Sequence, residues 1–358
     1  MCTLKKAMLF GVAGAAALAA GACGLIPSSV GVLPSAGSTA PALGATWTPT
    51  PFGPQAPTPT PAVTPTPAPT PTPTPDPSKP WGDFAGPTEP SAIEIQPPAS
   101  QISFDSSVVN ILVMGSDARP NEISGRSDVF MIVSLDPAQG TVTLLSIPRD
   151  LYVYVPGRRE DRINTAVVFG GPDLAIQTVL YNFGIPIQHW ITVNFSGFTT
   201  IVDQLGGIDV QSTGNLYDEC GHRWWRYTAG HTYHMDGFTA LCYVRMRETS
   251  SDFDRLRREQ EVIQAIFTKT LSVHGLTQIP ALFSQFTTYV HSDITVQEAL
   301  PLVPLAAKIS SDPTQIRRFA IDQSMAPGWR VPYSGASVLL PDWTKIEDLL
   351  NRAFPNAP

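Results

Sequence analysis

The chain has 358 residues, a formal net charge of −7 and a sequence pI near 5.3. An acidic chain is poorly suited to bind nucleic acid by bulk electrostatics, so we expect no nucleic-acid partner. Hydrophobic residues make up 43%, an ordinary share for a globular protein. More than half of the 36 prolines precede residue 100. The remainder, roughly 250 residues, is long enough for one α/β domain.

Residues 1–26 have the composition of an export leader or membrane anchor. Lys5 and Lys6 precede an uncharged run that ends at Ile26, and about 20 helical residues would just span a bilayer. Small residues stand directly before Cys23, which resembles a bacterial lipobox and makes Cys23 a candidate for lipidation. We rank a lipoprotein first, an uncleaved anchor second and a released protein third. All three place the folded part at the extracytoplasmic side of the cell membrane, facing the cell wall.

Residues 27–100 form a spacer that is rich in proline and threonine. Such a composition cannot bury a core, and proline favours an extended polyproline conformation. We interpret the segment as a disordered spacer that holds the domain away from the membrane. A tail without function is the alternative.

Residues 101–275 contain strands that alternate with helices, and residues 276–358 are interpreted as an extension that packs on the same domain. Strands and helices in alternation predict an α/β fold with α-β-α layers and a central mixed sheet. A hairpin is expected where two strands flank the turn at 136–140, and a helix is expected to start at Pro172. The expected strands are 108–114, 129–135, 142–147, 190–194, 208–210 and 241–244, and the expected helices are 172–183, 196–205 and 252–271.

Two cysteines, Cys220 and Cys242, lie in the folded part. In an exported domain such a pair favours a disulfide over two buried thiols, which remain the alternative. A zinc site with the nearby histidines His222, His231 and His234 is a weaker alternative, because the spacing matches no zinc module.

Between Arg119 and Arg258 the chain carries thirteen arginines and no lysine. The planar guanidinium offers paired donors that match phosphate or carboxylate oxygens, which an ammonium group does not. Four groups of polar residues lie at strand ends or loops, where functional groups of α/β proteins gather. They are Asp117 with Arg119; Arg126 with Asp128; Arg149 and Asp150 with Arg162 and Asn164; and Arg245, Arg247, Asp254, Arg255 and Gln260.

Other arginines have a plainer interpretation. Arg158 and Arg159 beside Glu160 and Asp161 are expected to form a solvated loop. Arg257 and Arg258 beside Glu259 and Glu261 are expected to form surface ion pairs of little energetic value. Arg245 and Arg247 have a functional interpretation instead. On a strand their side chains would point to the same face of the sheet, where two guanidiniums repel each other unless an anion lies between them.

No nucleophile elbow, Walker loop or zinc-protease motif is present in the sequence. If the four polar groups converge, aspartates and several guanidiniums would surround one site. That mixture suits a pyrophosphate bound with a divalent cation.

A series of segments also resembles one family. NILVMGSDAR, RSDVFMIVSLDP, VTLLSIPRDLYV, VDQLGGIDV, MDGFTALCYVRMR and DFDRLRREQ follow in order between about residues 105 and 270, and together they are similar to the LytR-CpsA-Psr (LCP) family. The resemblance implies an enzyme outside the bacterial membrane, a peptidoglycan–glycopolymer ligase. Such a phosphotransferase moves a glycopolymer from a polyprenyl-pyrophosphate carrier to peptidoglycan, with Mg²⁺ (or Mn²⁺).

The resemblance also implies roles for particular residues. It assigns metal and pyrophosphate contacts to Asp117 and Asp128, phosphate binding to Arg149, and further contacts to Arg119 and Arg162. The remaining head-group contacts are Arg245, Arg247, Arg255 and Gln260. Of the arginines, the resemblance makes Arg149, Arg245, Arg247 and Arg255 catalytic. Arg162 stands where many members have lysine, and Ala118 replaces a small hydroxyl residue.

Two other functions fit the same arginines. One is an anchored, non-catalytic protein that binds a wall polymer or a polyprenyl-phosphate lipid, and the other is a pyrophosphatase acting on the same carrier. A transcriptional regulator would need cytoplasmic residence and a basic reading helix, and the exported, acidic chain argues against both.

Overall fold

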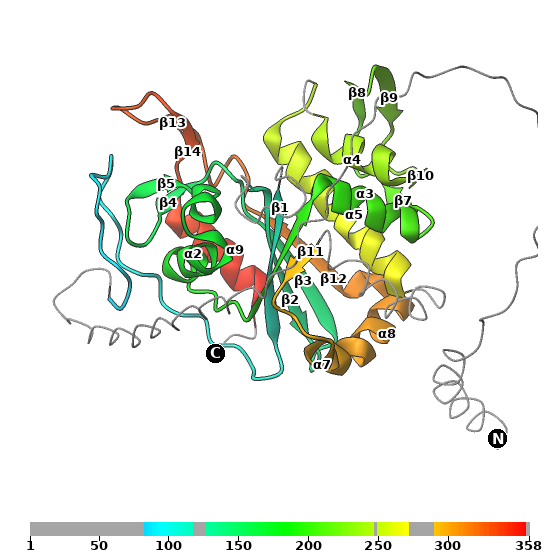
Figure 1. Ribbon diagram of the computed structural model, residues 1–358, viewed down its shortest axis with the longest axis horizontal. Coiled ribbons are helices and arrows are strands. Elements are labelled where there is room, and N and C mark those ends of the chain that lie inside the picture. Colours follow the sequence, from blue (N-terminus) through cyan, green and yellow to red (C-terminus); the bar gives the residue numbers. More distant parts are fainter. Residues whose placement is uncertain (1–81, 117–126, 247–248, 272–289, 356–358) are drawn as a thin grey trace, which may run out of the picture. The chain divides into compact units, whose positions relative to one another are not determined.

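A computed structural model describes residues 82–116, 127–246, 249–271 and 290–355 (Figure 1). The leader and residues 27–81 of the spacer lie outside these residues. No helix within the described ranges is both long and apolar enough to cross a membrane.

A mixed six-stranded sheet forms the centre, in the order β11-β6-β1-β2-β3-β12 (Figure 1). Its strands are β11 (Val290–Ser292), β6 (His189–Asn194), β1 (Val109–Ser116), β2 (Ser127–Asp136), β3 (Thr141–Ser146) and β12 (Ile316–Ala320). The β1-β2 and β2-β3 pairs are antiparallel, whereas β1-β6 and β3-β12 are parallel. Both outer strands come from the part of the chain after residue 289.

Helices and small hairpins surround this sheet. The helices are α2 (Thr165–Phe183), α3 (Phe195–Gln204), α4 (Gly237–Arg245), α5 (Asp252–Leu271), α7 (Val296–Ala299), α8 (Val303–Ser311) and α9 (Trp343–Ala353), with 3₁₀ turns at Leu300–Leu302 and Pro313–Gln315. The two-stranded sheets pair β4 (Tyr152–Tyr154) with β5 (Glu160–Arg162), β7 (Ile208–Gln211) with β10 (Thr232–Met235), β8 (Leu216–Cys220) with β9 (Arg223–Tyr227), and β13 (Gly328–Arg330) with β14 (Ser337–Leu339).

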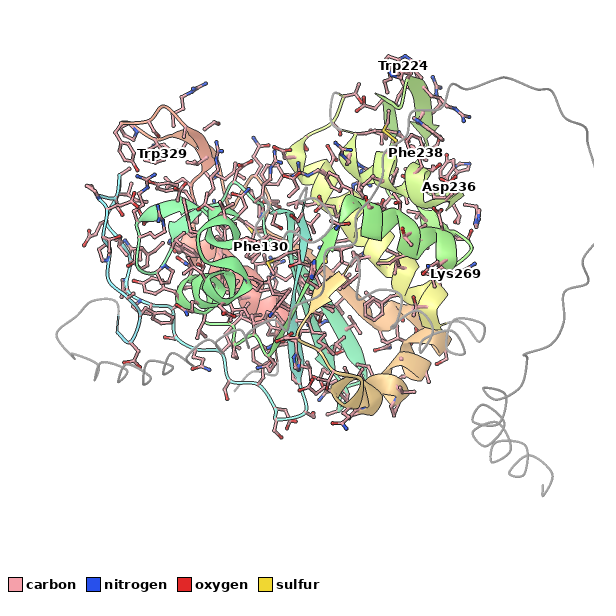
Figure 2. The ribbon with its side chains drawn as sticks, viewed as in Figure 1. Phe130, Trp224, Asp236, Phe238, Lys269 and Trp329 are labelled. Carbon is pink, nitrogen blue, oxygen red and sulfur yellow. A yellow bond between two sulfur atoms is a disulfide. The ribbon has the colours of Figure 1, made fainter. Side chains whose placement is uncertain are left out.

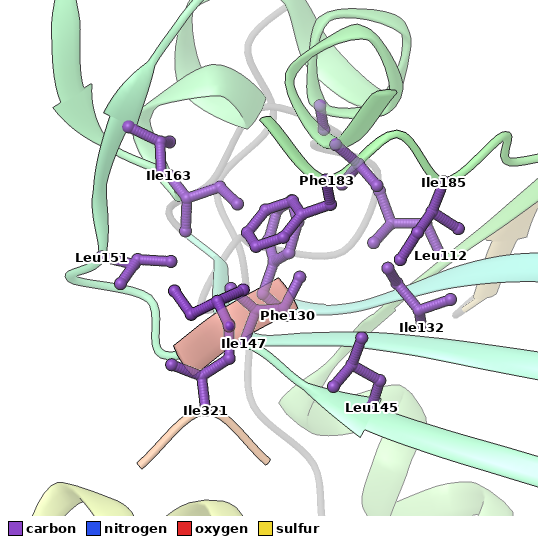
Figure 3. Close-up of a cluster of buried hydrophobic side chains, with 14 of the residues drawn as sticks. Leu112, Phe130, Ile132, Leu145, Ile147, Leu151, Ile163, Phe183, Ile185 and Ile321 are labelled. Atoms are coloured by element: carbon purple, nitrogen blue, oxygen red, sulfur yellow. The ribbon is translucent and has the colours of Figure 1, made fainter. Parts of the chain in front are cut away.

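The larger core lies between one face of the sheet and the helices α2 and α9. Phe130 of β2 belongs to it and is 1% exposed (Figure 2). Alternate residues of the central strands point to this face, because side chains alternate along a strand. Figure 3 shows several of them, with residues from the flanking segments: Leu112, Ile132, Leu145, Ile147, Phe183 and Ile185.

The intervening strand residues pack on the opposite face, against α5 and α8. This second layer contains Val133, Leu144, Leu305 and Ile309. The sheet is therefore covered on both faces, and the predicted α-β-α layering with a mixed sheet is confirmed. A separate core lies among α3, α4, α5 and β7, centred on Tyr243 and Met235, which are both fully buried.

Most expected elements are present, with informative differences. The hairpin at 136–140 forms, and Gly140 closes its turn at φ 69°. The helix expected from Pro172 begins earlier, at Thr165, but its backbone is broken at Gly170 and Gly171, so Pro172 starts a second helical segment. The helix expected at 196–205 is capped by Asn194, whose side chain accepts from the Gly197 backbone N–H.

One expected strand is wrong. Residues 241–244 lie in helix α4, not in a strand. Asp236 caps this helix through the Thr239 backbone N–H, and the helix runs to Arg245. Arg245 therefore ends a helix and does not lie on a strand face, while Arg247 lies outside the described residues.

A disulfide joins Cys220 and Cys242, as expected. It fastens the β8–β9 hairpin to α4. Neither free thiols nor a zinc site with these two cysteines is compatible with the bond.

We predict that replacing both cysteines, as C220S/C242S, lowers the free energy of unfolding by about 2–4 kcal/mol, because the unfolded chain regains freedom. Urea unfolding of the variant and the parent measures the difference. Adding a reductant to the parent should reproduce the loss, and it should leave the variant unchanged. Equal stability of the two proteins would contradict a structural role for this bond.

Candidate active site

The ends of three neighbouring strands place the charged residues of the candidate site together. Because β2 is antiparallel to both β1 and β3, the start of β2 lies at the same edge of the sheet as the ends of β1 and β3. Asp128 stands at the start of β2, and Arg149 follows β3 in the loop after Pro148. Residues far apart in the sequence therefore meet at one edge.

Arg149 and Asp128 form the central ion pair of this edge. The Arg149 Nη1 donates to Asp128 Oδ1 at 2.5 Å, and Arg149 Nε lies 3.3 Å from Asp150 Oδ2. The side chains of Arg149 and Asp128 are 20% and 36% exposed. Burial opposes the charge of Arg149, but the hydrogen bond and charge of Asp128, with Asp150 and Asp252, raise its pKa above the ordinary value. Arg149 is therefore a permanent cation that can still reach a ligand.

Asp150 links a second arginine to this pair. Its Oδ1 lies 3.2 Å from Arg162 Nε, at the end of β5. Arg162 also donates to the Ser337 carbonyl at 2.6 Å. The predicted site residue Arg162 thus joins Arg149 through a shared carboxylate.

The first turns of α5 bring the third arginine. Arg255 Nη1 lies 3.2 Å from Asp252 Oδ1, and its Nε lies 3.2 Å from Glu259 Oε1. Arg255 is 6% exposed and Glu259 is 4% exposed. Ser251 and Asp254 cap the helix, with Ser251 Oγ donating to Asp254 Oδ2 and the Asp254 backbone N–H donating to Ser251 Oγ.

Electrostatic interactions show that α5 and the strand edge belong to one site. Glu259 interacts with the charges of Asp128 and Arg149 as well as that of Arg255, and Arg149 interacts with Asp252. We call this set the arginine–carboxylate cluster: Asp128, Arg149, Asp150, Arg162, Asp252, Arg255 and Glu259. The expected convergence of Arg149 and Arg255 beside Asp128 is therefore present.

Glu259 is a buried carboxyl group within the cluster. Burial raises its pKa to about 8, and Asp128 adds to the rise, while Arg255, Arg258 and Arg149 act in the opposite direction. Its Oε2 has no hydrogen-bond partner among the described residues. At neutral pH this side chain is therefore mainly protonated, which removes one negative charge from beside the arginines.

The surface ion pairs expected on this face of α5 are wrong for three of the residues. Arg258, Glu259 and Glu261 were expected at the surface, yet they are 0%, 4% and 3% exposed. Arg258 donates to the Met246 carbonyl and to Ser250 Oγ, so it holds the chain that leads into α5. Glu160 is likewise buried, not solvated, and burial raises its pKa to about 8. The alternation of charges along the sequence did not reveal which of them face inward.

Arg245 lies at the end of α4, with its guanidinium carbon 4.6 Å from the centre of the Phe195 ring. Phe195 begins α3 and lines the apolar groove described below. Arg245 is therefore exposed at the rim of that groove and not within the ion pairs of the cluster.

Gln260 occupies a different environment from the one expected. It is 5% exposed, and its side-chain nitrogen donates to Ser146 Oγ at 2.9 Å and to the Phe319 carbonyl at 2.6 Å. It thereby fastens α5 to β3 and β12, and its role as a substrate contact stays a prediction. Three other predicted residues, Asp117, Arg119 and Arg247, lie outside the described residues, as does Cys23.

An apolar groove adjoins the cluster, between the sheet and the helices α3, α4 and α5. Of the described residues that line it, Glu259 is the one ionisable side chain. The other lining residues are almost all apolar and include Val113, Val193, Phe195, Phe198, Leu241, Val244, Ile263 and Phe267. Glu259 thus stands where the groove meets the arginines. Sequence reasoning did not locate this groove, because its walls come from six separate elements.

Of the two predicted metal ligands, Asp128 lies within the described residues and Asp117 does not. Within residues 82–116, 127–246, 249–271 and 290–355, no group of three His, Cys, Asp or Glu side chains could hold a metal ion. Asp128 offers a partly exposed carboxylate, the donor type that Mg²⁺ prefers, and one of its oxygens contacts Arg149. Its expected companion Asp117 is outside these ranges.

A profile of the LytR_cpsA_psr family matches residues 87–353. The match covers most of the chain, and the protein therefore belongs to the LytR_cpsA_psr family, as the sequence segments indicated.

Named relatives agree with this membership. The polyisoprenyl-teichoic acid–peptidoglycan teichoic acid transferase TagU of Halalkalibacterium halodurans is 32% identical over 199 residues, which is 54% of this chain and 64% of that protein. TagU of Bacillus anthracis is 36% identical over 193 residues, which is 53% of this chain and 62% of that protein. The chain thus matches slightly less than two thirds of the length of these relatives.

Solved structures share the fold. The crystal structure of B. subtilis TagV is 28% identical, with a TM-score of 0.60, and the match covers 71% of this chain and all of that one. The structure of TagT bound to LIIa-WTA is 25% identical, with a TM-score of 0.56, over 71% of this chain and 93% of that one.

The raised pKa of Glu259 predicts a specific pH dependence of stability. Above the ordinary pKa of 4.5 the unfolded chain loses this proton, while the folded protein keeps it up to about pH 8. The free energy of unfolding should therefore fall between pH 4.5 and 8, by at most about 1.4 kcal/mol per pH unit from this group. In E259Q that contribution is absent, so stability should fall less over the same range.

Urea unfolding at pH 5, 6, 7 and 8 measures this slope. E160Q is the companion variant, because Glu160 is a second buried carboxyl with a pKa raised to about 8, on β5. Each single variant should remove part of the slope and the double variant more. An unchanged slope in E259Q would show that Glu259 is ionised in the folded protein.

Proposed function

We propose that the protein is an extracytoplasmic phosphotransferase that moves a glycopolymer from a polyprenyl-pyrophosphate carrier to peptidoglycan. One observation carries the proposal: the arginine–carboxylate cluster and the apolar groove meet at Glu259. A polyprenyl pyrophosphate has the same two-part character, with a charged head and a long apolar tail. The names of the TagU relatives give the same substrate class.

The groove supports binding of the lipid tail. Its walls are carbon-rich, so a prenyl chain would lose water on entering and would gain roughly 25 cal/mol for each Å² of apolar surface buried. The pyrophosphate head group is covalently joined to the lipid tail. A tail bound in the groove would therefore bring the pyrophosphate close to Arg149 and Arg255.

The arginines support the chemistry at the head group. In the proposed reaction a sugar hydroxyl of the acceptor forms a bond to the glycan-linked phosphorus, the bond from that phosphorus to the polyprenyl phosphate breaks, and the hydroxyl proton is released. Negative charge grows on the bridging oxygen as the lipid phosphate leaves. Arg149, Arg162 and Arg255 are held in place by their carboxylate partners, so they need little reorganisation to stabilise that charge.

The proposal includes Mg²⁺ (or Mn²⁺), held by Asp128 and Asp117 together with substrate oxygens. Such an ion would neutralise charge on the phosphates when bound. The carboxylate of Asp128 supports this assignment by its donor type and partial exposure. We also propose that the leader, with Cys23 as the lipidation candidate, anchors the protein at the outer face of the membrane.

We predict that R149A lowers the rate of glycopolymer transfer by about 10²–10³-fold, because it removes a donor that stabilises growing charge. R149K should remain impaired, since an ammonium lacks the paired donors of a guanidinium. The assay follows transfer of a labelled lipid-linked glycan to peptidoglycan, with Mg²⁺ and with a chelator. R352A, on the exposed side of α9, is the control and should keep the parental rate.

This assay distinguishes a transferase from a pyrophosphatase and from a non-catalytic binding protein. Ligated glycan supports transfer, released glycan phosphate would favour a pyrophosphatase, and binding without product would favour a non-catalytic protein. A parental rate in folded R149A would remove Arg149 from the site.

A second prediction concerns the groove. I263W places a large side chain among the groove-lining residues, so less polyprenyl phosphate should co-purify with the protein and transfer should fall. T268W changes an exposed position of the same helix and should retain the lipid. Mass spectrometry of lipid extracted from the two purified proteins makes the comparison. Equal lipid content would show that the tail binds elsewhere.

A further inference from the structure

The β8–β9 hairpin projects from the domain next to α4, and its inner side is firmly attached (Figure 1). The Cys220–Cys242 disulfide joins it to α4. On the same inner side, Tyr227 packs edge-on against the buried Tyr243, with ring centres 4.7 Å apart. Thr249 Oγ1 donates to the Tyr217 carbonyl at 2.7 Å, which ties the hairpin to the segment before α5. The hairpin is therefore a rigid support.

The outer face of the hairpin carries two large aromatic side chains that remain in water. Tyr217 is 49% exposed and Trp224 is 52% exposed, and their rings stack at 4.9 Å with an angle of 26° between planes. Strand register places Arg226 opposite Tyr217 and Glu219 opposite Trp224 on this face. Figure 2 shows Trp224 at the outer end of the hairpin, with Phe238 of α4 below it. We call Tyr217, Glu219, Trp224 and Arg226 the hairpin platform.

Folding alone does not account for this platform. Cross-strand stacking can contribute up to about 1 kcal/mol to a hairpin, but the disulfide and the inner aromatic contacts already hold this one. Two half-exposed aromatic rings instead keep apolar surface in contact with water, and a patch of this kind commonly marks an interaction site. Tyrosine and tryptophan offer rigid, flat surfaces of this type at interfaces.

A hollow beside the platform adds hydrogen-bonding groups. Tyr217 and Arg226 line it together with Asn215, Thr228 and Thr249. Flat aromatic faces next to amide, hydroxyl and guanidinium groups suit a pyranose sugar, which presents C–H groups on one face and hydroxyl or acetamido groups at its edge. Thr249, which lines the hollow, also lies in the segment that leads into α5, shortly before Asp252 of the cluster.

The charge of the platform distinguishes between glycans. One arginine and one glutamate face outward, so the platform has no net charge. Because Glu219 offsets Arg226, the platform lacks the net positive charge that would favour a polyphosphate chain, whereas a chain of N-acetylated hexoses with few charges does not require it. The apolar groove already accounts for the lipid end of the donor in the proposed function, and it is lined by other residues.

We propose that the hairpin platform binds the glycan strand of the acceptor, a chain of N-acetylated hexopyranoses such as that of peptidoglycan. Trp224 stacks on a sugar ring, Tyr217 supports Trp224 by ring stacking, and the neighbouring hollow receives the polar substituents of the sugars. The hairpin would thereby guide a strand toward the segment that precedes α5. This inference rests on the proposed function for the identity of the acceptor, but binding itself needs neither donor nor turnover.

The test measures binding of the full-length chain, purified in detergent, to soluble peptidoglycan glycan strands from which the peptides have been removed. W224A and Y217A should each weaken binding by about tenfold or more, which corresponds to about 1.4 kcal/mol. W224F, which keeps a stacking ring, should weaken it less. Y333A removes an exposed aromatic ring from outside the hairpin, 55% exposed in the parent, and should bind like the parent. Thermal unfolding of each variant confirms that it is folded.

Parental affinity for glycan strands in both W224A and Y217A would overturn the proposal, as would the absence of binding by the parent. Selective loss of binding to an anionic wall polymer would overturn it in favour of a donor site. Selective loss of binding to phospholipid vesicles would overturn it in favour of a membrane contact. R149A distinguishes the proposed transferase function from glycan binding by the platform, because this variant should keep glycan binding while losing transfer. If parental protein binds glycan strands through the platform but transfers nothing, the proposed function fails and the platform stands.

Discussion

The ion pair between Arg149 and Asp128 is the interaction on which the organisation of the site depends. It closes the edge where β2 starts and β3 ends, and its neighbours Asp150 and Glu259 connect it to Arg162 and to α5. A guanidinium taken partly out of water needs compensating charge, and carboxylates supply it. Each arginine of the cluster is thus oriented before any ligand arrives. Preorganised cations of this kind stabilise charge more effectively than mobile ones, since little reorganisation is needed.

Glu259 stands where two contrasting environments meet. On one side lie the arginines, and on the other an apolar groove whose described lining contains no further ionisable group. Burial keeps this carboxyl largely protonated at neutral pH, so the groove is not bounded by a full negative charge. An amphiphile with an anionic head would meet cations at one end and carbon at the other. The fold obtains this contrast by placing α5 across the sheet, with Arg255 and Glu259 toward the edge and Ile263 and Phe267 toward the groove.

Several features could be predicted because they depend on local rules. The hairpin and its turn at 136–140 follow from short-range sterics and hydrogen bonding, and both are present. Other expectations failed for tertiary reasons. Residues 241–244 form a helix because Asp236 caps it and its inner face packs on α3 and α5, which four residues of sequence could not show. Arg258 and Glu259 were assigned to the surface, although the face of α5 that carries them packs against the rest of the domain.

The sequence by itself determined several chemical features of this protein: arginine in place of lysine, a pair of cysteines able to bond, and motifs that place the chain in its family. Those features are visible because residue identity and short spacing carry them. Tertiary structure alone decided which charges meet, which are buried and where apolar surface remains open. The groove, the protonated Glu259 and the exposed platform on the hairpin all arise from contacts between distant segments. Dielectric environment and solvent exposure belong to the folded arrangement and to no single stretch of sequence.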